Sequence, residues 1–144
     1  MIVKEAEEQD IPALLEIGKR LPGFKAETEL PFYLDTLGFE LYVLEDDDKK
    51  DIGFLCLRLE DDTEAEIDDI AVSQEEEGKG KADFLLKEVL RECALKGVKK
   101  IYLEVRSHNS RAIKLYERNG FVAYRTRKRY YPDDDALCYS REEK

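Results

Sequence analysis

Residues 75–82, which read EEEGKGKA, could bind a phosphate group. They follow a strand-like run at residues 68–72 and precede a long helical pattern. Glycines between a strand and a helix let the backbone approach a phosphate closely, and the free N–H groups of the first helical turn then point toward it. Lys79 and Lys81 would add positive charge. Such glycines often only make the turn, and the run is neither a P-loop nor a complete dinucleotide fingerprint.

Residues 103–121 hold side chains that could move protons. Glu104 lies in the strand-like string LEVR, and Tyr116 lies in the helical run that ends in Asn-Gly-Phe. A carboxylate can accept a proton, and a tyrosine stays protonated up to about pH 10 and can donate one. Each also has an ordinary structural interpretation, because a strand glutamate is usually solvated and a tyrosine on an apolar helix face usually belongs to the core.

Together, the two stretches resemble the GNAT N-acetyltransferase superfamily. The strand, Gly-x-Gly turn and helix resemble its acetyl-CoA motif, and the run N-x-x-A-x-x-x-Y-x-x-x-G-F at residues 109–121 resembles its next motif in every named position. The string from residue 103, continued by RYYP at residues 129–132 and by DA at 135–136, looks like the ribosomal-protein-alanine branch, the RimI type. The resemblance implies one α/β domain over residues 1–144 with a mixed sheet, which uses acetyl-CoA and no metal.

The resemblance also implies which residues bind the cofactor. The pantetheine arm would pair like a strand with the backbone of Ile70, Ala71 and Val72. Asn109 would help to hold the cofactor, although alone it indicates a helix N-cap. The pyrophosphate would lie on backbone N–H groups of one continuous run: Glu77, Gly78, Lys79, Gly80, Lys81 and Ala82.

In the same way, the resemblance implies the catalytic residues. Glu104 would act as the general base through a water molecule, and Tyr116 would protonate the leaving thiolate. Asp69 is the alternative base, because other members of the superfamily place theirs on that strand. Tyr130 and Tyr131 would contact the acceptor or pack the last hairpin. His108, the sole histidine, is interpreted as a loop residue.

Two departures from the family pattern bear on function. Glu75 stands where the family usually has Gln or Arg, and two further glutamates follow it. A carboxylate about 7 Å from a phosphate charge costs up to roughly 2 kcal/mol at an effective dielectric constant of 20, so the run predicts weaker cofactor binding. Residues 22–27 lack the Pro-Trp-Ser-like sequence expected on the acceptor side.

Three functions remain open from the sequence. The first is an acetyl-CoA-dependent N-acetyltransferase that acts on the N-terminal α-amine of a protein or peptide, such as a ribosomal protein. The second is a GNAT enzyme that acetylates a small amine, such as a polyamine or an amino acid, which an acidic surface would suit. The third is a catalytically silent module that binds acyl-CoA or a partner, which the glutamate run would favour.

Eleven elements are needed to position these residues, in the order β-α-α-β-β-β-α-β-α-β-β. A short strand at residues 2–3 precedes a helix capped by Asp10 and a second helix capped by Thr28. Acidic turns separate strands at residues 40–45, 51–60 and 65–72. The long helix after Gly80 repeats apolar residues every three or four positions. The remaining elements are a strand at 100–106, a helix from Asn109 or Ser110, and strands at 121–131 and 136–140.

Composition limits the classes of partner. The 144 residues contain 24 Lys and Arg and 34 Asp and Glu, a net charge of −10. A nucleic-acid-binding domain of this size is usually basic, so neither nucleic acid nor an anionic membrane is expected as a ligand. The three cysteines have no paired spacing, and no signal peptide is evident, which predicts a cytoplasmic protein. An exposed sheet edge would allow a monomer or a homodimer.

Overall fold

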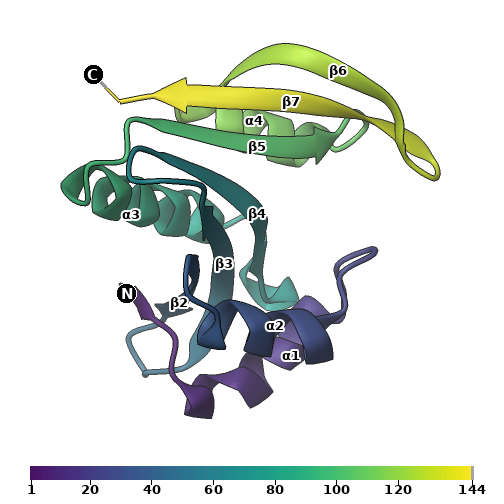
Figure 1. Cartoon of the computed structure of the whole chain (residues 1–144). Helices are drawn as coiled ribbons and strands as arrows, with labels where there is room; N and C mark the ends of the chain where they lie inside the picture. Colours follow the sequence, from purple (N-terminus) through teal and green to yellow (C-terminus); the bar gives the residue numbers. More distant parts are fainter. Residues whose placement is uncertain (144) are drawn as a thin grey trace.

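The chain forms one mixed seven-stranded sheet covered on both faces by helices, as the computed structural model of residues 1–143 shows (Figure 1). The strands are β1 (Ile2–Glu5), β2 (Phe39–Glu45), β3 (Asp51–Leu59), β4 (Glu64–Val72), β5 (Lys100–Arg106), β6 (Val122–Tyr131) and β7 (Asp134–Glu142). The helices are α1 (Ile11–Gly18), α2 (Ala26–Asp35), α3 (Lys81–Leu95) and α4 (Ser110–Arg118). Two 3₁₀ turns, η1 (Glu8–Asp10) and η2 (Gln74–Glu76), precede α1 and α3.

The strands lie in the order β1-β2-β3-β4-β5-β7-β6, and only β4 and β5 are parallel. Their pairing runs from Glu64 opposite Lys100 to Ile67 opposite Leu103 and then stops. Beyond that point β4 continues beside β3 while β5 continues beside β7, so the two parallel strands diverge (Figure 1). The sheet is therefore split on one side of its centre, between the two stretches that the sequence analysis singled out.

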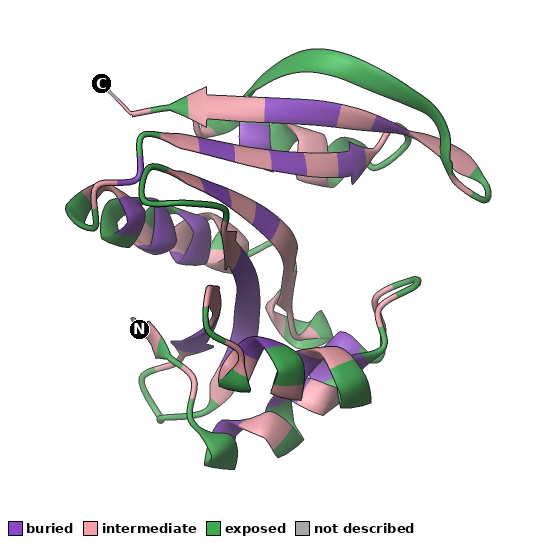
Figure 2. Ribbon diagram, in the orientation of Figure 1, coloured by how far each residue is buried: buried purple, intermediate pink, exposed green. Residues whose placement is uncertain are grey.

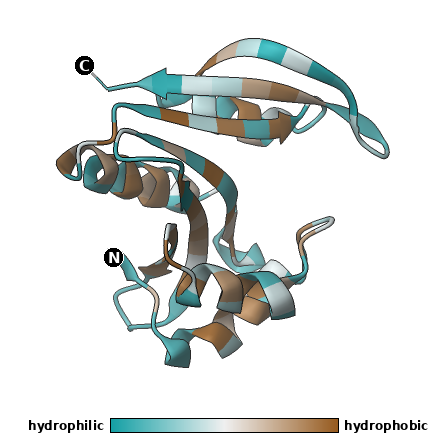
Figure 3. Ribbon diagram, in the orientation of Figure 1, coloured by the Kyte–Doolittle hydropathy of each residue, from teal (hydrophilic) through white to brown (hydrophobic). Residues whose placement is uncertain are grey.

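Each face of the sheet has its own apolar core. α3 and α4 cover one face, where Leu85, Leu86 and Val89 of α3 are fully buried. α1 and α2 cover the other face, where Leu14, Leu30 and Phe54 are fully buried. Burial of one such side chain stabilises the fold by roughly 1.5–3 kcal/mol. Buried and apolar segments accordingly follow the inner sides of the helices and the central strands, whereas β6 is exposed along nearly its whole length (Figures 2 and 3).

A β-bulge interrupts the pairing of β3 with β4 beside the split. Cys56 lies opposite Asp69 and Leu57 lies opposite Ile67, which leaves Asp68 as the extra residue. The Asp68 carboxylate accepts hydrogen bonds from Arg58 of β3 and from the Tyr33 hydroxyl of α2. These bonds attach the bulge to both neighbouring elements, so they hold the adjacent Asp69 in place.

The predicted order of eleven elements is confirmed. Of the two predicted helix caps, the one at Thr28 is wrong, and Asp10 occupies the N-cap position of α1 without forming a side-chain cap. Asp10 precedes α1 in a helical backbone conformation, and its carboxylate accepts a hydrogen bond from the N–H of Glu7 instead of capping α1. α2 begins at Ala26, so Thr28 lies inside its first turn. The Glu29 carboxylate there accepts a hydrogen bond from the N–H of Lys25. No helix within residues 1–143 is both long and apolar enough to cross a membrane.

Candidate active site

A cavity of about 540 Å³ lies between the end of β4, the start of α3 and α4. Every residue predicted to bind the cofactor lines it except Lys79, which is exposed outside it. The lining members of that set are Ile70, Ala71, Val72, Glu77, Gly78, Gly80, Lys81, Ala82 and Asn109. The fold thus brings the two motif regions to opposite walls of one cavity.

The glycine turn provides the geometry of an anion cradle. Gly78 and Gly80 have φ angles of 76° and 77°, in the left-handed region that favours glycine. Gly80 is the N-cap of α3, and no side chain caps this helix end. The first N–H groups of an α-helix have no acceptor within the helix, and the helix dipole places partial positive charge there. The turn therefore fits the pyrophosphate of a coenzyme A thioester.

The split in the sheet exposes backbone where a pantetheine arm would need it. Residues 70–72 pair with β3 along one edge. Along the other edge β5 has already diverged, and no other strand in the described part of the chain pairs there. These three residues line the cavity, so their unpaired edge is available to an extended ligand that itself carries amides. The residues present fit coenzyme A at both its phosphates and its arm.

Each glutamate of the run that follows β4 forms an ion pair with at least one basic side chain. Glu75 forms an ion pair with Lys50 at 3.9 Å, and Glu76 forms one with Lys81 at 3.7 Å. Glu77 lies between two arginines, Arg20 and Arg111, and is 2.9 Å from a guanidinium nitrogen of each. These pairs would offset part of the repulsion between the run and a phosphate. Weaker cofactor binding stays a prediction.

A second cavity, of about 410 Å³, adjoins the first along β4. Asp69 lines the second cavity and Ile70 lines the first, so the two meet at consecutive residues. The second cavity also contains Glu104, from the diverging end of β5, and Tyr130 and Tyr131, from the end of β6. The residues predicted to handle the acceptor are therefore brought together, next to the predicted cofactor residues.

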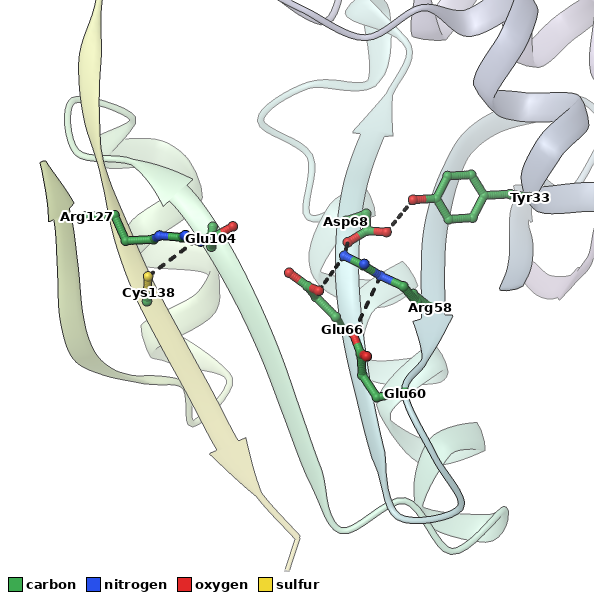
Figure 4. Close-up of polar contacts among 8 residues, drawn as sticks. All are labelled: Tyr33, Arg58, Glu60, Glu66, Asp68, Glu104, Arg127 and Cys138. Carbon is green, nitrogen blue, oxygen red and sulfur yellow. Dashed lines mark hydrogen bonds and ion pairs between the residues drawn. The ribbon is translucent and has the colours of Figure 1, made fainter. Parts of the chain in front are cut away.

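Glu104 is held by an arginine that the sequence analysis did not consider. One oxygen of its carboxylate accepts a hydrogen bond from Arg127 of β6 at 2.8 Å, and the Cys138 thiol of β7 lies 3.5 Å from the same oxygen (Figure 4). Arg127 in turn stacks on the Tyr130 ring, 4.6 Å from its centre. Because Arg127 follows Glu104 by 23 residues, no local pattern could indicate this pair.

Carboxylates dominate the second cavity. Glu29, Glu66, Asp68, Asp69 and Glu104 all line it. Arg58 bonds Glu66 and Asp68 (Figure 4), and Arg106 bonds Asp133 at the rim. Burial and the nearby carboxylates of Glu29 and Asp68 raise the pKa of Asp69 to about 7. Burial and Asp68 likewise raise the pKa of Glu66 to about 7. The cavity therefore has a surplus of negative charge and suits a cationic acceptor.

Tyr116 is buried in the core and lines neither of the two cavities. Its ring packs edge-on against Phe121, with 5.8 Å between ring centres. Burial, with smaller contributions from the Asp69 carboxylate and from Tyr131, raises the pKa of Tyr116 well above its usual value near 10. The hydroxyl is therefore protonated at neutral pH and can only donate a proton there. Its core packing agrees with the ordinary interpretation as well.

Two further predicted residues have clear structural positions. Asn109 caps α4, because its side-chain oxygen accepts a hydrogen bond from the N–H of Ala112 at 3.2 Å, and it also lines the first cavity. His108 lies in the exposed loop before it, where Nδ1 is 3.0 Å from an oxygen of Asp134. Neither of the two cavities includes His108. Its interpretation as a loop residue agrees with this position.

Sequence reasoning found Lys81 but missed two arginines of the first cavity. Arg20, just after α1, and Arg111, in α4, both line it. Arg111 stands between Asn109 and Ala112 of the recognised motif, so its position on the cavity side of α4 could have been found from helical spacing. Nothing near Arg20 in the sequence indicates its role, because only the packing of α1 against the sheet brings it there.

Comparisons with known proteins agree with this architecture. Residues 11–121 match the Acetyltransferase (GNAT) family. A stretch of 66 residues is 39% identical to [ribosomal protein bS18]-alanine N-acetyltransferase of Escherichia coli K12, covering 46% of this chain and 45% of that protein. The chain thus aligns with less than half of the length of the curated relatives it matches.

Solved structures match over a longer range. The ribosomal-protein-S18-alanine N-acetyltransferase from Escherichia coli superposes with a TM-score of 0.86 at 28% identity, over 98% of this chain and 92% of that one. A GNAT family acetyltransferase from Elizabethkingia anophelis, with acetyl-CoA bound, superposes with a TM-score of 0.84 at 21% identity, over 99% of this chain and 97% of that one. The second likeness shows the fold alone.

Proposed function

Because this chain belongs to the GNAT acetyltransferase family, we propose that it transfers the acetyl group of acetyl-CoA to an N-terminal α-amine of a protein, such as a ribosomal protein. One observation carries the proposal: the phosphate-binding cavity and the acidic cavity meet at Asp69 and Ile70 of β4. A thioester held along β4 would thus have its acetyl group beside the acceptor cavity. The relatives named for ribosomal-protein alanine support this acceptor class.

In this proposal the first cavity binds the cosubstrate. Acetyl-CoA supplies an acetyl group that is already activated as a thioester. The N–H groups at the start of α3 bind its pyrophosphate, and the free edge of residues 70–72 bonds the amides of its arm. A backbone N–H near Ile70 would stabilise negative charge on the thioester oxygen as the amine attacks.

The second cavity binds the amine and removes its proton. An ammonium group cannot attack a thioester, so Glu104 accepts a proton from the attacking nitrogen through a water molecule. Its contact with Arg127 orients the carboxylate. On the other side, the Tyr116 hydroxyl donates a proton to the departing sulfur. Asp69, which lies at the junction of the cavities, is the alternative base.

The chemistry of the acceptor favours an α-amine over a lysine side chain. A free α-amine has a pKa of about 8, whereas a lysine amine has one near 10.4. Removing the proton at neutral pH is therefore about 3 kcal/mol easier for the α-amine. A single carboxylate that acts through water suits the easier of these two tasks.

A small polycationic amine is the second candidate acceptor. Five carboxylates line the acceptor cavity, and its two lining arginines, Arg58 and Arg106, are both engaged by carboxylates. A polyamine would neutralise several of these groups at once. A peptide with a basic residue near its N-terminus would also neutralise several carboxylates, because its α-amine and its basic side chain both carry positive charge.

The proposal is tested by assaying acetyl transfer with three acceptors under identical conditions. These are a peptide with an N-terminal alanine followed by a basic residue, the same peptide with a blocked N-terminus but a free lysine, and spermidine. We expect turnover with the first peptide and none with the second. Turnover with spermidine alone would establish the second candidate. Absence of turnover with every amine, despite bound acetyl-CoA, would contradict an enzymatic function.

A further inference from the structure

Glu77 links three elements around the mouth of the first cavity. Its two carboxylate oxygens each bond a different guanidinium group, that of Arg20 after α1 and that of Arg111 in α4, both at 2.9 Å. All three side chains line the cavity. Arg20 and Glu77 are 57 residues apart, and Glu77 and Arg111 are 34 apart. A single carboxylate therefore lies between two cations that come from different parts of the chain.

The two arginines have the chemistry of a phosphate site. Guanidinium groups bind carboxylates and phosphates with the same planar hydrogen-bonding geometry. Arg111 also lies against the glycine turn, because a β-carbon added to Gly78 would be 3.4 Å from its terminal nitrogen. Arg111 thus stands beside the N–H groups that the proposed function assigns to the pyrophosphate, and Arg20 is joined to Arg111 through the Glu77 carboxylate.

We propose that Arg20 and Arg111 bind the phosphate groups of coenzyme A, and that Glu77 is an internal anion that competes with those phosphates for the same two guanidinium groups. This inference rests on the proposed function, because it assumes that coenzyme A enters this cavity. The incoming phosphate would exchange with the carboxylate, which would turn toward solvent. Glu77 therefore lowers the affinity of the site for coenzyme A.

The charges favour this exchange. A carboxylate has at most one negative charge, whereas the 3′-phosphate monoester of coenzyme A carries about −1.5 to −2 at pH 7 and its pyrophosphate carries one on each of two adjacent phosphates. The Glu77 side chain is about one-third exposed, and ion pairs at such positions contribute little stability. The other two glutamates of the run have partners of their own, Lys50 and Lys81, so they leave the arginines to Glu77.

The test measures the dissociation constant of coenzyme A by isothermal titration calorimetry, without an acceptor and without turnover. We expect Glu77→Gln to lower that constant about three- to tenfold, because it frees both arginines and keeps the side chain's size. The matched control is Glu88→Gln, which removes the same charge from an ion pair with Arg91 on α3, outside the cavity lining. It should change the constant less than twofold. Adding Arg111→Gln to the Glu77→Gln variant should cancel the gain.

Dephospho-coenzyme A identifies the phosphate involved. A gain that persists with this ligand assigns the arginines to the pyrophosphate, and a gain seen only with coenzyme A assigns them to the 3′-phosphate. Tight binding by wild type with no gain in Glu77→Gln, or an equal gain in Glu88→Gln, would overturn the inference and leave the proposed function standing. If no variant binds coenzyme A, both are overturned.

Discussion

At the scale of single residues, Glu104 and Tyr116 are distinguished by their surroundings more than by their types. Glu104 lies at the acceptor cavity with an arginine partner, where a carboxylate stays accessible to water. Tyr116 is buried, and the rise in its pKa makes it a proton donor only. The two side chains thus suit the two proton transfers of the proposed reaction. Glu104 would accept the proton that leaves the amine, and Tyr116 would donate the proton that reaches the sulfur.

Conservative substitutions at these two positions test that division. We expect Glu104→Gln and Tyr116→Phe each to lower kcat about 100-fold or more, which is the usual contribution of a general base or acid. The dissociation constant of acetyl-CoA should change less than threefold, because neither side chain lines the first cavity. Steady-state kinetics and calorimetry provide the two readouts. Full activity of Glu104→Gln with loss of activity in Asp69→Asn would move the base to Asp69.

Asp69 should make stability depend on pH. Its pKa is about 7 in the folded protein and about 3.9 in an unfolded chain, so the folded state binds more protons between these values. The free energy of unfolding therefore falls as pH rises from about 4 to 7. We expect Asp69→Asn to stabilise the protein at pH 8 by up to about 4 kcal/mol, and to have little effect below pH 4.

Chemical denaturation of wild type and Asp69→Asn at several pH values measures this effect. A stability difference that does not vary with pH would show that the carboxylate titrates normally. Glu66→Gln is the control for a second raised carboxylate in the same cavity, and it should show a similar dependence. The crowded carboxylates of the acceptor cavity would then lower the free energy of unfolding. A cationic acceptor would raise it again by neutralising them on binding.

At the scale of elements, the proposed binding of phosphates depends on the turn between β4 and α3. Its two glycines adopt left-handed φ angles, and its helix begins without a side-chain cap. A side chain at such a φ is strained whatever space surrounds it. The turn thus needs glycine for its conformation, and the uncapped N–H groups follow from that conformation.

Gly80→Ala separates strain from binding. We expect it to lower the free energy of unfolding by about 1–2 kcal/mol and to raise the dissociation constant of coenzyme A at least fivefold, because relaxing the strain turns N–H groups away from the phosphate. Gly97→Ala is the matched control. Gly97 also has a positive φ, a β-carbon added to it would point into open space among the described residues, and it is remote from the cavity. It should lose similar stability without any change in binding.

The divergence of β4 and β5 is the second feature at this scale, because it leaves one backbone edge of β4 unpaired. Two parallel strands that paired along their full length would leave no free edge at residues 70–72. The bulge at Asp68 lies where the pairing ends, and its bonds to Arg58 and Tyr33 tie β4 toward β3 and α2. The same contacts therefore hold the split open and hold Asp69 at the junction of the cavities.

At the scale of the whole molecule, binding of coenzyme A should raise the free energy of unfolding of the entire domain. The first cavity involves α1, β4, α3 and α4, so coenzyme A would bridge elements from both faces of the sheet. A ligand at 100 times its dissociation constant adds about 2.7 kcal/mol. For a domain of this size, that corresponds to a rise in Tm of roughly 5–11 °C.

Thermal unfolding with and without acetyl-CoA is the direct measurement. A rise of that size would support the cofactor cavity despite the glutamate run, and adenosine at the same concentration serves as the control without phosphates. An unchanged Tm at saturating concentrations would favour the silent partner-binding module that the run suggested.

The sequence by itself determined the local features of this protein. The order of eleven elements follows from apolar spacing and turn residues, which act over a few positions. The same holds for the glycine turn and the motif at residues 109–121. Even at this range the cap at Thr28 was wrong and Asp10, at the N-cap position of α1, forms no side-chain cap, because capping depends on backbone angles that neighbouring packing selects.

Only the tertiary structure decided how these features meet. The contacts of Arg20 with Glu77 and of Arg127 with Glu104 join residues 57 and 23 positions apart. The raised pKa of Asp69 arises from burial and from the carboxylates of Glu29, on α2, and of its chain neighbour Asp68. Sheet register and helix packing set these distances, and electrostatic effects depend on distance and burial and not on sequence separation. The motifs of the site can therefore be found from short stretches of sequence, whereas its ion pairs and pKa shifts depend on the tertiary structure.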